Sequence, residues 1–414
     1  MKKNVVSILL SSIMVASMLA GCGSSDTNTA DVAKGEEPVK QVEKQEIDIW
    51  YYWNNESHQE ILAKELEKFN ATHDDIIAVA KYVPFADFKK QLSIGVTSSE
   101  LPDIAIIDGP DHASYAAMGI FADITGEINE DEFYAGPIDS CKLDGKLYGI
   151  PFGSNCLSLF YNEDMLNEAG VKPPTTWDEL KETAKKLTKD KRSGIAFSSL
   201  QTEEGTFNFS PWLWSTGTDS FHINNEQGIK AISFVKDLVK EGVMTKEVIN
   251  WGQGDVMNQF ISGNVAMMIN GPWQVPTMRE LAPDLNWNVT LIPKDKEYAS
   301  VLGGENLAVI QSDHVEQSLE VAKFLTSKEE IEGFIDAFGY ISARKDVASN
   351  QFEGDEQMKK FIEQMQYAKP RGPHENWPEI SDAISLAFNE AITNSTTPEQ
   401  AAEKAQKTID SIVK

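Results

Sequence analysis

Hydrophobic residues in the first part of the chain alternate between strand-like runs and helical faces. Residues 47–53 and 76–82 are rich in β-branched and aromatic side chains and are predicted to be strands. Residues 104–107 form a continuous apolar run, which is typical of a strand buried on both faces. Apolar residues between these strands recur at the spacing of one helix face, at Ile61, Leu62, Leu66 and Phe69 and then at Phe85, Phe88 and Leu92. This order predicts a parallel sheet covered by helices.

The predicted sheet also suggests where a ligand would bind. In parallel α/β sheets, ligands lie beyond the carboxyl ends of the strands. Trp53 and Asn54 follow the first predicted strand, and the segment 108–111 follows the third. We therefore expect these two segments to contribute to a binding site.

Capping patterns mark the starts of helices farther along the chain. Capping boxes are expected at Thr176 with Glu179, at Ser327 with Glu330, and at Thr397 with Gln400. In the last of these, proline at position 398 is suited to the first helical turn. The folded part of the chain is thus predicted to be α/β with many helices.

The N-terminus has the features of a secretory leader. Lys2 and Lys3 precede an apolar run over residues 5–20, which is shorter than the roughly 20 residues that span a bilayer. Residues 19–22, Leu-Ala-Gly-Cys, resemble the lipobox of bacterial lipoproteins, in which the cysteine is lipidated. We expect a signal peptide at 1–21, and then lipidated Cys22 with a disordered polar tether at 22–46. Two acyl chains on Cys22 would be enough for stable membrane anchoring.

Length and charge limit the remaining possibilities. The chain has 414 residues, more than one compact domain usually holds, so two lobes are expected. Its 64 acidic and 37 basic residues give a net charge of −27, which argues against nucleic acid and against anionic ligands. A neutral or cationic ligand is favoured.

Motifs for catalysis or for a metal or cofactor are not found in the sequence. The six histidines are scattered without an HExxH pattern, and GxSxG and GxGxxG are absent. Cys141 and Cys156 lie on either side of Asp144-Gly145, a hairpin turn signal, without the spacing of a metal site. These two cysteines either form a disulfide outside the cytoplasm or are two small buried side chains. We expect no catalytic residue, no metal and no cofactor.

Several of the nine tryptophans adjoin glycine, proline or asparagine, as is common in loops. The examples are Trp53, Trp212, Trp214, Trp273 and Trp377. A tryptophan in a loop can stack on a ligand that has apolar faces and polar edges. Ordinary packing is the alternative, because tryptophan is highly buried on average.

Several short motifs carry a family resemblance. They lie at residues 101–104, 144–151, 159–162, 174–180, 266–273 (Ala-Met-Met-Ile-Asn-Gly-Pro-Trp) and 324–327. In order and rough spacing, over essentially all of 47–414, they resemble the extracellular solute-binding lipoproteins of bacterial ABC transporters. The most similar subgroup is the sugar-binding one typified by the maltose-binding protein.

The resemblance implies a two-lobed periplasmic-binding-protein fold of type II. Each lobe would have a mixed, mainly parallel sheet flanked by helices, with a hinge between the lobes. The N-terminal lobe would comprise residues 47–154 and 302–344, and the C-terminal lobe residues 155–301 and 345–414. The chain would cross between lobes near 153–157, near 302 and near 344.

The family's ligand contacts can be carried over motif by motif. The ligand-binding residues would be Trp53, Asn54, Glu56, Asp108, Asp111, Phe209, Trp212, Trp273, Glu305, Asn306 and Trp377. In the resemblance, Phe209 and Trp212 match an aromatic loop that stacks on sugar rings, and Trp273 does the same. Where the maltose-binding protein has a tryptophan before the third-strand loop, this chain has Ile107, which leaves the recognised sugar open.

The resemblance implies a monomeric, membrane-anchored receptor that delivers a neutral sugar or oligosaccharide to an ABC permease. The carboxylates of Glu56, Asp108 and Glu305 would accept hydrogen bonds from sugar hydroxyls. A receptor for another ligand such as a polyamine, a surface glycan-processing enzyme, and a sensor subunit for a membrane kinase are the alternatives. Turnover of a glycan would distinguish the enzyme, and the membrane partner would distinguish the sensor.

Overall fold

The computed structural model describes residues 44–98, 100–349, 351–372 and 374–413. The predicted leader, Cys22 and nearly all of the predicted tether lie outside the described residues. Within the described ranges, no helix combines the length and the apolar character needed to cross a membrane.

A first sheet is built around three parallel strands. β2, β1 and β3 lie side by side and parallel, and the full order is β11-β6-β10-β3-β1-β2, with β12 paired to β10. β10 runs antiparallel to β3 and to β6, so the sheet is mixed. The strands are β1 (Gln45–Tyr51), β2 (Ile76–Tyr82), β3 (Ile104–Asp108), β6 (Gly149–Cys156), β10 (Ser300–Val309), β11 (Ile341–Ser342) and β12 (Ala368–Pro370). The predicted strand–helix–strand–helix–strand order is confirmed.

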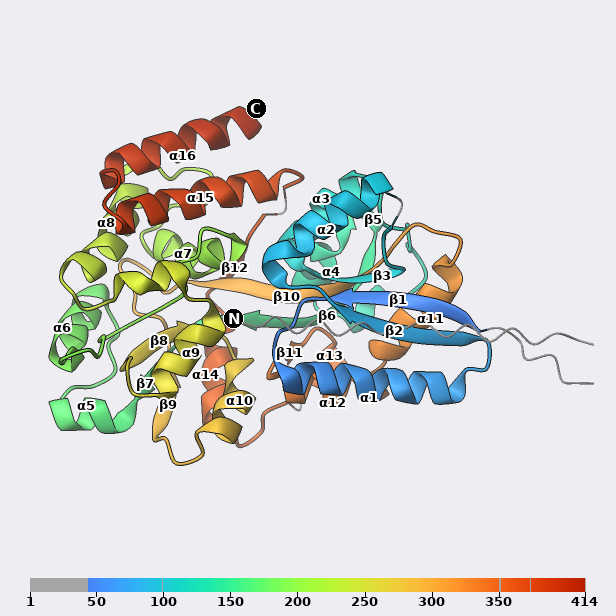
Figure 1. The fold of residues 1–414 in the computed structure, drawn as a ribbon, viewed down its shortest axis with the longest axis horizontal. Helices are drawn as coiled ribbons and strands as arrows, with labels where there is room; N and C mark the ends of the chain where they lie inside the picture. Colours follow the sequence, from blue (N-terminus) through green and yellow to red (C-terminus); the bar gives the residue numbers. More distant parts are fainter. Residues whose placement is uncertain (1–43, 99, 350, 373, 414) are drawn as a thin grey trace, which may run out of the picture. The chain divides into compact units, whose positions relative to one another are not determined.

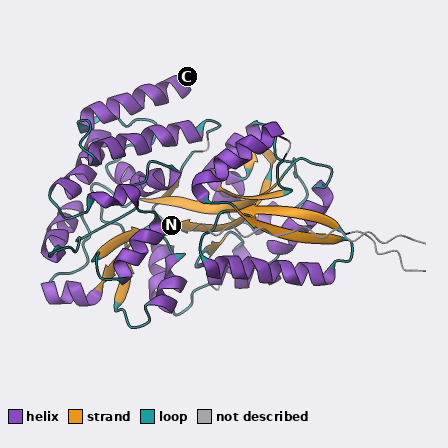
Figure 2. Cartoon of the chain, viewed as in Figure 1, coloured by secondary structure: helices purple, strands orange, loops and turns teal. Residues whose placement is uncertain are grey.

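Helices cover both faces of this sheet (Figures 1 and 2). On β1, Ile47 and Ile49 face one core with α1 and α12, whereas Trp50 faces a second core with α2 and α3. This alternation follows from the two-residue period of a strand. The elements around the sheet are α1 (Glu56–Thr72), α2 (Phe85–Ser98), α3 (Gly109–Ala117), η1 (Glu130–Glu132), α4 (Ala135–Ser140), β4 (Lys142–Leu143), β5 (Lys146–Leu147), α11 (Val315–Leu325), α12 (Lys328–Phe338) and α13 (Lys345–Ala348).

A second, smaller sheet has the order β8-β7-β9. Its pairs are antiparallel, with isolated parallel bridges at Ser193–Val265 and Ala196–Met268, so it is mixed rather than mainly parallel as expected. The elements here are β7 (Ser158–Asn162), α5 (Glu163–Ala169), α6 (Trp177–Leu187), α7 (Glu203–Ser215), α8 (Glu226–Lys240), η2 (Lys246–Asn250), α9 (Gln253–Ile261), β8 (Met267–Asn270), α10 (Gln274–Leu281), β9 (Trp287–Thr290), α14 (Glu356–Met365), α15 (Trp377–Ile392) and α16 (Pro398–Ile412).

The buried side chains separate into lobes. The cores around the first sheet contain residues from 47–152 and 307–347, and the core around the second contains residues from 156–301 and 358–409. β6 and β10 run antiparallel from one core to the other, which is visible in Figure 1 as the long strand β10 that crosses the molecule. A third connection lies between α13 and α14. The exact lobe boundaries stay a prediction.

The capping patterns have three different outcomes. At α16 both hydrogen bonds of the capping box between Thr397 and Gln400 are present, as predicted. At α6 Thr176 caps the helix, but the Glu179 carboxylate accepts from the Thr175 backbone instead of closing the box. α12 begins after Ser327 without a side-chain cap. The Glu330 carboxylate, which would complete the capping box, pairs with Lys68 of α1 instead.

Three further sequence-based expectations are settled by the structure. Trp212 and Trp214 lie inside α7 rather than in a loop, because the helix continues through Pro211 and loses only the backbone donor of that residue. Asp144 and Gly145 both have positive φ, of 50° and 77°, and form the predicted hairpin turn. Cys141 and Cys156 are free, buried thiols in different cores, which favours the second of the two alternatives for them.

The capping outcomes generate a stability prediction. We expect Thr397→Ala to lower the free energy of unfolding by about 1 kcal/mol, because the N-terminal amides of α16 lose their acceptor. Ser327→Ala is the matched control and should cost less, since Ser327 caps no amide. Urea unfolding midpoints at constant slope measure both changes. Equal losses in the two variants would contradict the assignment.

Candidate functional site

A cavity of about 680 Å³ lies between the two lobes. Its wall includes Tyr52, Asp108 and Glu305 from the first lobe, and Glu203 and Trp273 from the second. Tyr52 directly follows β1 and Asp108 is the last residue of β3, so these two lie at the carboxyl ends of parallel strands, as the rule for such sheets predicts. Glu305 lies within β10. The volume is within the range of small-molecule sites.

Local chain geometry sets the positions of the main side chains. Asp108 is the last residue of β3, and it lies directly opposite Glu305 of the neighbouring strand β10. The pairing of these two strands therefore fixes the positions of both residues. Trp273 immediately precedes α10, and its ring lies directly over Gly271. A Cβ at Gly271 would be 2.0 Å from this ring, so only glycine allows Trp273 to adopt its position.

Aromatic rings from both lobes form part of the cavity wall. The Trp273 ring lies 6.2 Å from that of Phe207 and 6.2 Å from that of Tyr340, the latter edge-on. Trp53 packs edge-on against Phe338 behind the wall, at 4.5 Å between centroids. Rings of this kind offer flat apolar faces to a ligand.

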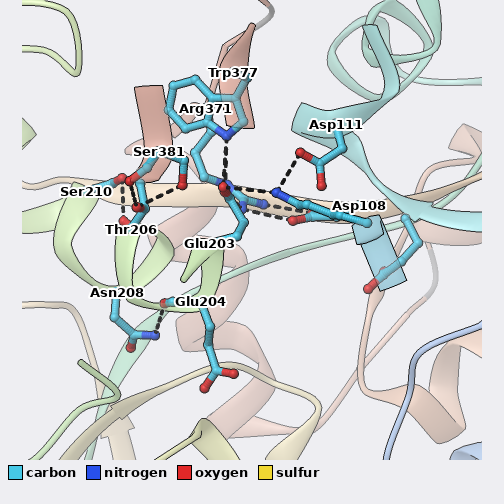
Figure 3. A network of polar contacts seen from close by, with 12 residues as sticks. Asp108, Asp111, Glu203, Glu204, Thr206, Asn208, Ser210, Arg371, Trp377 and Ser381 are labelled. Atoms are coloured by element: carbon cyan, nitrogen blue, oxygen red, sulfur yellow. Dashed lines mark hydrogen bonds and ion pairs between the residues drawn. The ribbon is translucent and has the colours of Figure 1, made fainter. Parts of the chain in front are cut away.

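A buried guanidinium joins the two lobes at the cavity wall (Figure 3). Arg371 donates from Nη1 and Nη2 to the two carboxylate oxygens of Asp108, at 2.9 and 2.8 Å, and from Nη1 to Glu203 at 2.5 Å. Its guanidinium also lies 4.4 Å from the centre of the Phe207 ring. Burial lowers the pKa of Arg371, but the two carboxylates more than offset this and raise it above its ordinary value. The side chain is therefore a permanent cation that holds Asp108 of β3 to Glu203 of α7.

Lys89 of α2 extends the same charge network. Its Nζ lies 2.9 Å from Asp111 and 3.6 Å from Glu203. Burial alone would raise the pKa of Glu203, but the cations of Lys89 and Arg371 bring it below its ordinary value. The indole Nε1–H of Trp377 donates to both oxygens of Glu203, at 3.2 and 3.1 Å. Glu203 is thus ionised and held from three sides.

Glu305 is a second buried carboxyl group with a different environment. Its Oε1 accepts hydrogen bonds from the hydroxyls of Tyr52 and Tyr340, each at 3.0 Å. Burial, and then the charge of Asp108, raise the pKa of Glu305 to about 7, although the side chains of Tyr340, Tyr52 and Trp53 act in the opposite direction.

Six buried polar atoms of residues that line the cavity have no hydrogen-bond partner among the described residues. The donors are Trp53 Nε1, Gln253 Nε2 and Arg371 Nε, the acceptors are Asn155 Oδ1 and Glu305 Oε2, and the sixth atom is His58 Nε2. Leaving such groups unpaired costs about 1–3 kcal/mol each, so a ligand that pairs with them gains affinity. The wall therefore offers both donors and acceptors around aromatic faces, which suits a polyhydroxylated molecule.

The structure brings six of the residues expected from the sequence to the cavity and leaves five outside its lining. The lining residues are Trp53, Asn54, Glu56, Asp108, Trp273 and Glu305. Those outside are Asp111, Phe209, Trp212, Asn306 and Trp377. Phe209 and Trp212 are fully buried in the core of the second lobe, because the segment that carries them is a helix. Asp111 and Trp377 contact the network around Glu203, and Asn306 bonds Ser140.

The sequence did not indicate several residues of the site. Arg371, Glu203, Lys89, Phe207 and Tyr340 belong to no motif and lie far apart along the chain. The sequence offered one signal. Arginine is scarce in this acidic chain, so Arg371, which lies between Pro370 and Gly372, was a candidate for a buried ion pair.

Comparison with known proteins identifies the family. Residues 64–360 match the family described as bacterial extracellular solute-binding protein, which is more than half of the chain. The chain belongs to this family. Members are solute-binding proteins rather than enzymes, and they act outside the cytoplasm.

Individual relatives of this solute-binding protein are distant in sequence. A binding protein of Brucella abortus is 26% identical over 85% of this chain and 89% of its own, and the galactooligosaccharide-binding protein of Bacillus subtilis is 22% identical over 99% and 97%. Among solved structures, a Thermotoga lettingae ABC transporter solute-binding protein bound to α-D-tagatose is 25% identical, with a TM-score of 0.84 over 90% of this chain and 100% of its own. The two-lobed fold is therefore shared along nearly the whole length.

The Arg371 network generates a stability prediction. We expect Arg371→Met to lower the free energy of unfolding by about 3–5 kcal/mol, because Asp108 and Glu203 stay buried without their cation. The control Arg279→Met removes an exposed ion pair with Asp355 and should cost about 0–1 kcal/mol.

A compensated variant sharpens this test. Adding Asp108→Asn and Glu203→Gln to Arg371→Met removes the uncompensated charges and should recover much of the lost stability in urea unfolding. Equal losses for Arg371→Met and Arg279→Met would contradict the role of the network.

Glu305 predicts a pH dependence. With a folded pKa of about 7 against an ordinary 4.5, the folded state keeps the proton while the unfolded state loses it, so stability falls as pH rises through this window. We expect Glu305→Gln to remove this loss. The free energy of unfolding of the variant, minus that of wild type, should therefore be about 2–3 kcal/mol larger at pH 8 than at pH 4. Unfolding at both pH values measures the difference, with exposed Glu332→Gln as control. A difference independent of pH would refute the assignment.

Proposed function

We propose that this protein captures a sugar or oligosaccharide in the cavity between its lobes and delivers it to an ABC importer. One observation carries the proposal. The flat ring of Trp273 (the Trp273 platform) lines the same interlobe cavity as residues whose polar atoms have no hydrogen-bond partner among the described residues. A sugar ring has an apolar face that stacks on an aromatic side chain and hydroxyls that pair with polar edges. The binding of sugars by members of the same family, in structures of similar fold, supports the same ligand class.

Six side chains are assigned to the ligand in this proposal. Trp273 and Trp53 supply ring faces and an indole donor, and Asn54, Glu56, Asp108 and Glu305 supply polar contacts. Because the cavity wall comes from both lobes, a bound sugar would favour the closed arrangement of the hinge, and the permease would recognise that arrangement.

The N-terminal features complete the proposal. Cleavage before Cys22 and lipidation of that residue would anchor the protein, as a monomer, to the outer face of the cell membrane. The polar segment after Cys22 would then act as a tether that keeps the folded body close to its permease.

A binding experiment tests the proposal. Calorimetric titration would use the mature chain from residue 22, with Cys22→Ser to avoid lipidation, against mono- and oligosaccharides and spermidine. We expect micromolar or tighter binding of one sugar class. Trp273→Ala should weaken that binding by roughly 30-fold or more, because about 2 kcal/mol of buried aromatic contact is lost, and Trp273→Phe should weaken it less.

The exposed aromatic Tyr134 provides the control, since it lies outside the cavity. Tyr134→Ala should bind sugar with wild-type affinity. Binding of spermidine alone would assign the cavity to a polyamine, and no heat from any ligand with folded protein would reject the sugar assignment.

A further inference from the structure

The cavity wall carries far more negative than positive charge. The carboxylates on it are Glu56, Glu60, Asp108, Glu203, Glu204, Asp255, Glu280 and Glu305. Within the described part of the chain, Arg371 is the one lysine or arginine on the wall, and it is already bound to Asp108 and Glu203. None of the other six carboxylates forms an ion pair with a described lysine or arginine. This excess of acidic groups has no basic partner in the part of the chain that the structure describes.

A bound metal ion does not account for the excess. No group of three or more acidic, histidine or cysteine side chains in the described residues is arranged to hold one. His58, which also lines the wall, does not compensate either, because burial lowers its pKa to about 3 and keeps it neutral. The outer carboxylates, such as those of Glu56 and Asp255, are exposed. Salt screens their electric field, which still attracts a cation toward the cavity.

One of these six acidic groups is buried, and above its pKa of about 7 it is a carboxylate. Glu305 is only 5% exposed, and its Oε1 accepts both tyrosine hydroxyls. Its Oε2 is buried and has no partner among the described residues, and Glu305 is one of the residues that line the cavity. A buried carboxylate oxygen of this kind gains most from a charged donor.

Aromatic side chains lie around the Glu305 carboxyl group. Tyr52 and Tyr340 both contact Glu305, and the ring of Tyr340 lies edge-on to Trp273 at 6.2 Å. The ring of Trp53 lies 6.5 Å from that of Tyr52. Aromatic faces attract cations through their quadrupole, so the rings and the carboxylate favour the same kind of ligand group.

We propose that the sugar bound in this cleft carries a protonated amine, and that its ammonium group pairs with Oε2 of Glu305. The inference rests on the proposed sugar-binding function and replaces the expectation of a neutral sugar. Sugars with a carboxylate are excluded by the same field. The Trp273 platform favours an amino sugar over a linear polyamine, because only the sugar has a ring face to stack on it.

Matched pairs of sugars test this proposal by calorimetry on the mature Cys22→Ser chain. The pairs are glucose with glucosamine, galactose with galactosamine, and cellotriose with the glucosamine trimer, and galacturonic acid serves as the acidic comparison. We expect the amine-bearing member of at least one pair to bind ten-fold or more tightly than its neutral partner. Added salt should reduce this preference, and so should a pH above the pKa of the amine.

Substitution at Glu305 tests the assigned residue. Glu305→Gln should bring the two members of the pair to within about two-fold of each other, whereas Glu332→Gln, an exposed glutamate outside the cavity, should keep the wild-type preference. Circular dichroism establishes that each variant is folded. A preference that survives Glu305→Gln would overturn the pairing with this residue.

The remaining outcomes separate this inference from the proposed function. Neutral sugars that bind as tightly as their amine-bearing partners would overturn the inference and leave the sugar-binding function in place. Binding of spermidine without any sugar, or no binding at all by folded protein, would overturn both.

Discussion

The arrangement of the cleft depends on the ion pairs that the guanidinium of Arg371 forms with Asp108 and Glu203. The guanidinium is buried between Asp108, at the end of a first-lobe strand, and Glu203, at the start of a second-lobe helix. Removing charges from water is costly, and this cost is offset only when the geometry is good and each charge has partners. The bidentate contact with Asp108, with Lys89 and Trp377 on Glu203, meets that condition. The network thereby fixes the inner wall of the cavity.

The cleft combines this satisfied network with groups that are left unsatisfied. The Arg371 network uses its carboxylates internally, whereas Glu305 keeps one oxygen free and has a raised pKa because it is buried near Asp108. Trp273 adds a flat apolar face that exists only because position 271 is glycine. A preformed wall of this type lowers the ordering cost of binding, so its unpaired groups can be used for affinity and specificity.

Much of the fold was predictable from the sequence, because it depends on local patterns. The parallel strands β1, β2 and β3 follow from apolar runs and the helices between them, and the cap of α16 follows from Thr397 and Gln400. The predictions of the α12 capping box and of a loop around Trp212 were wrong, because contacts between residues far apart in the sequence outweighed the local sequence pattern. Glu330 pairs with Lys68 instead of capping α12, and Pro211 lies inside a helix that tertiary packing maintains.

The site was predictable only in part, for the same reason. Trp53, Asp108 and Trp273 follow strands or a glycine-proline turn and could be placed from the sequence. Arg371 and Glu203 are far apart in the second lobe's sequence, and Arg371 reaches Asp108 through the packing of the two lobes, which no spacing along the chain records. A crystal structure with the bound sugar tests the role of this cleft most directly. We predict a sugar ring against Trp273 and a polar group of the ligand within hydrogen-bond distance of Glu305 Oε2. A ligand bound outside the interlobe cavity, or one that contacts neither side chain, would contradict this prediction.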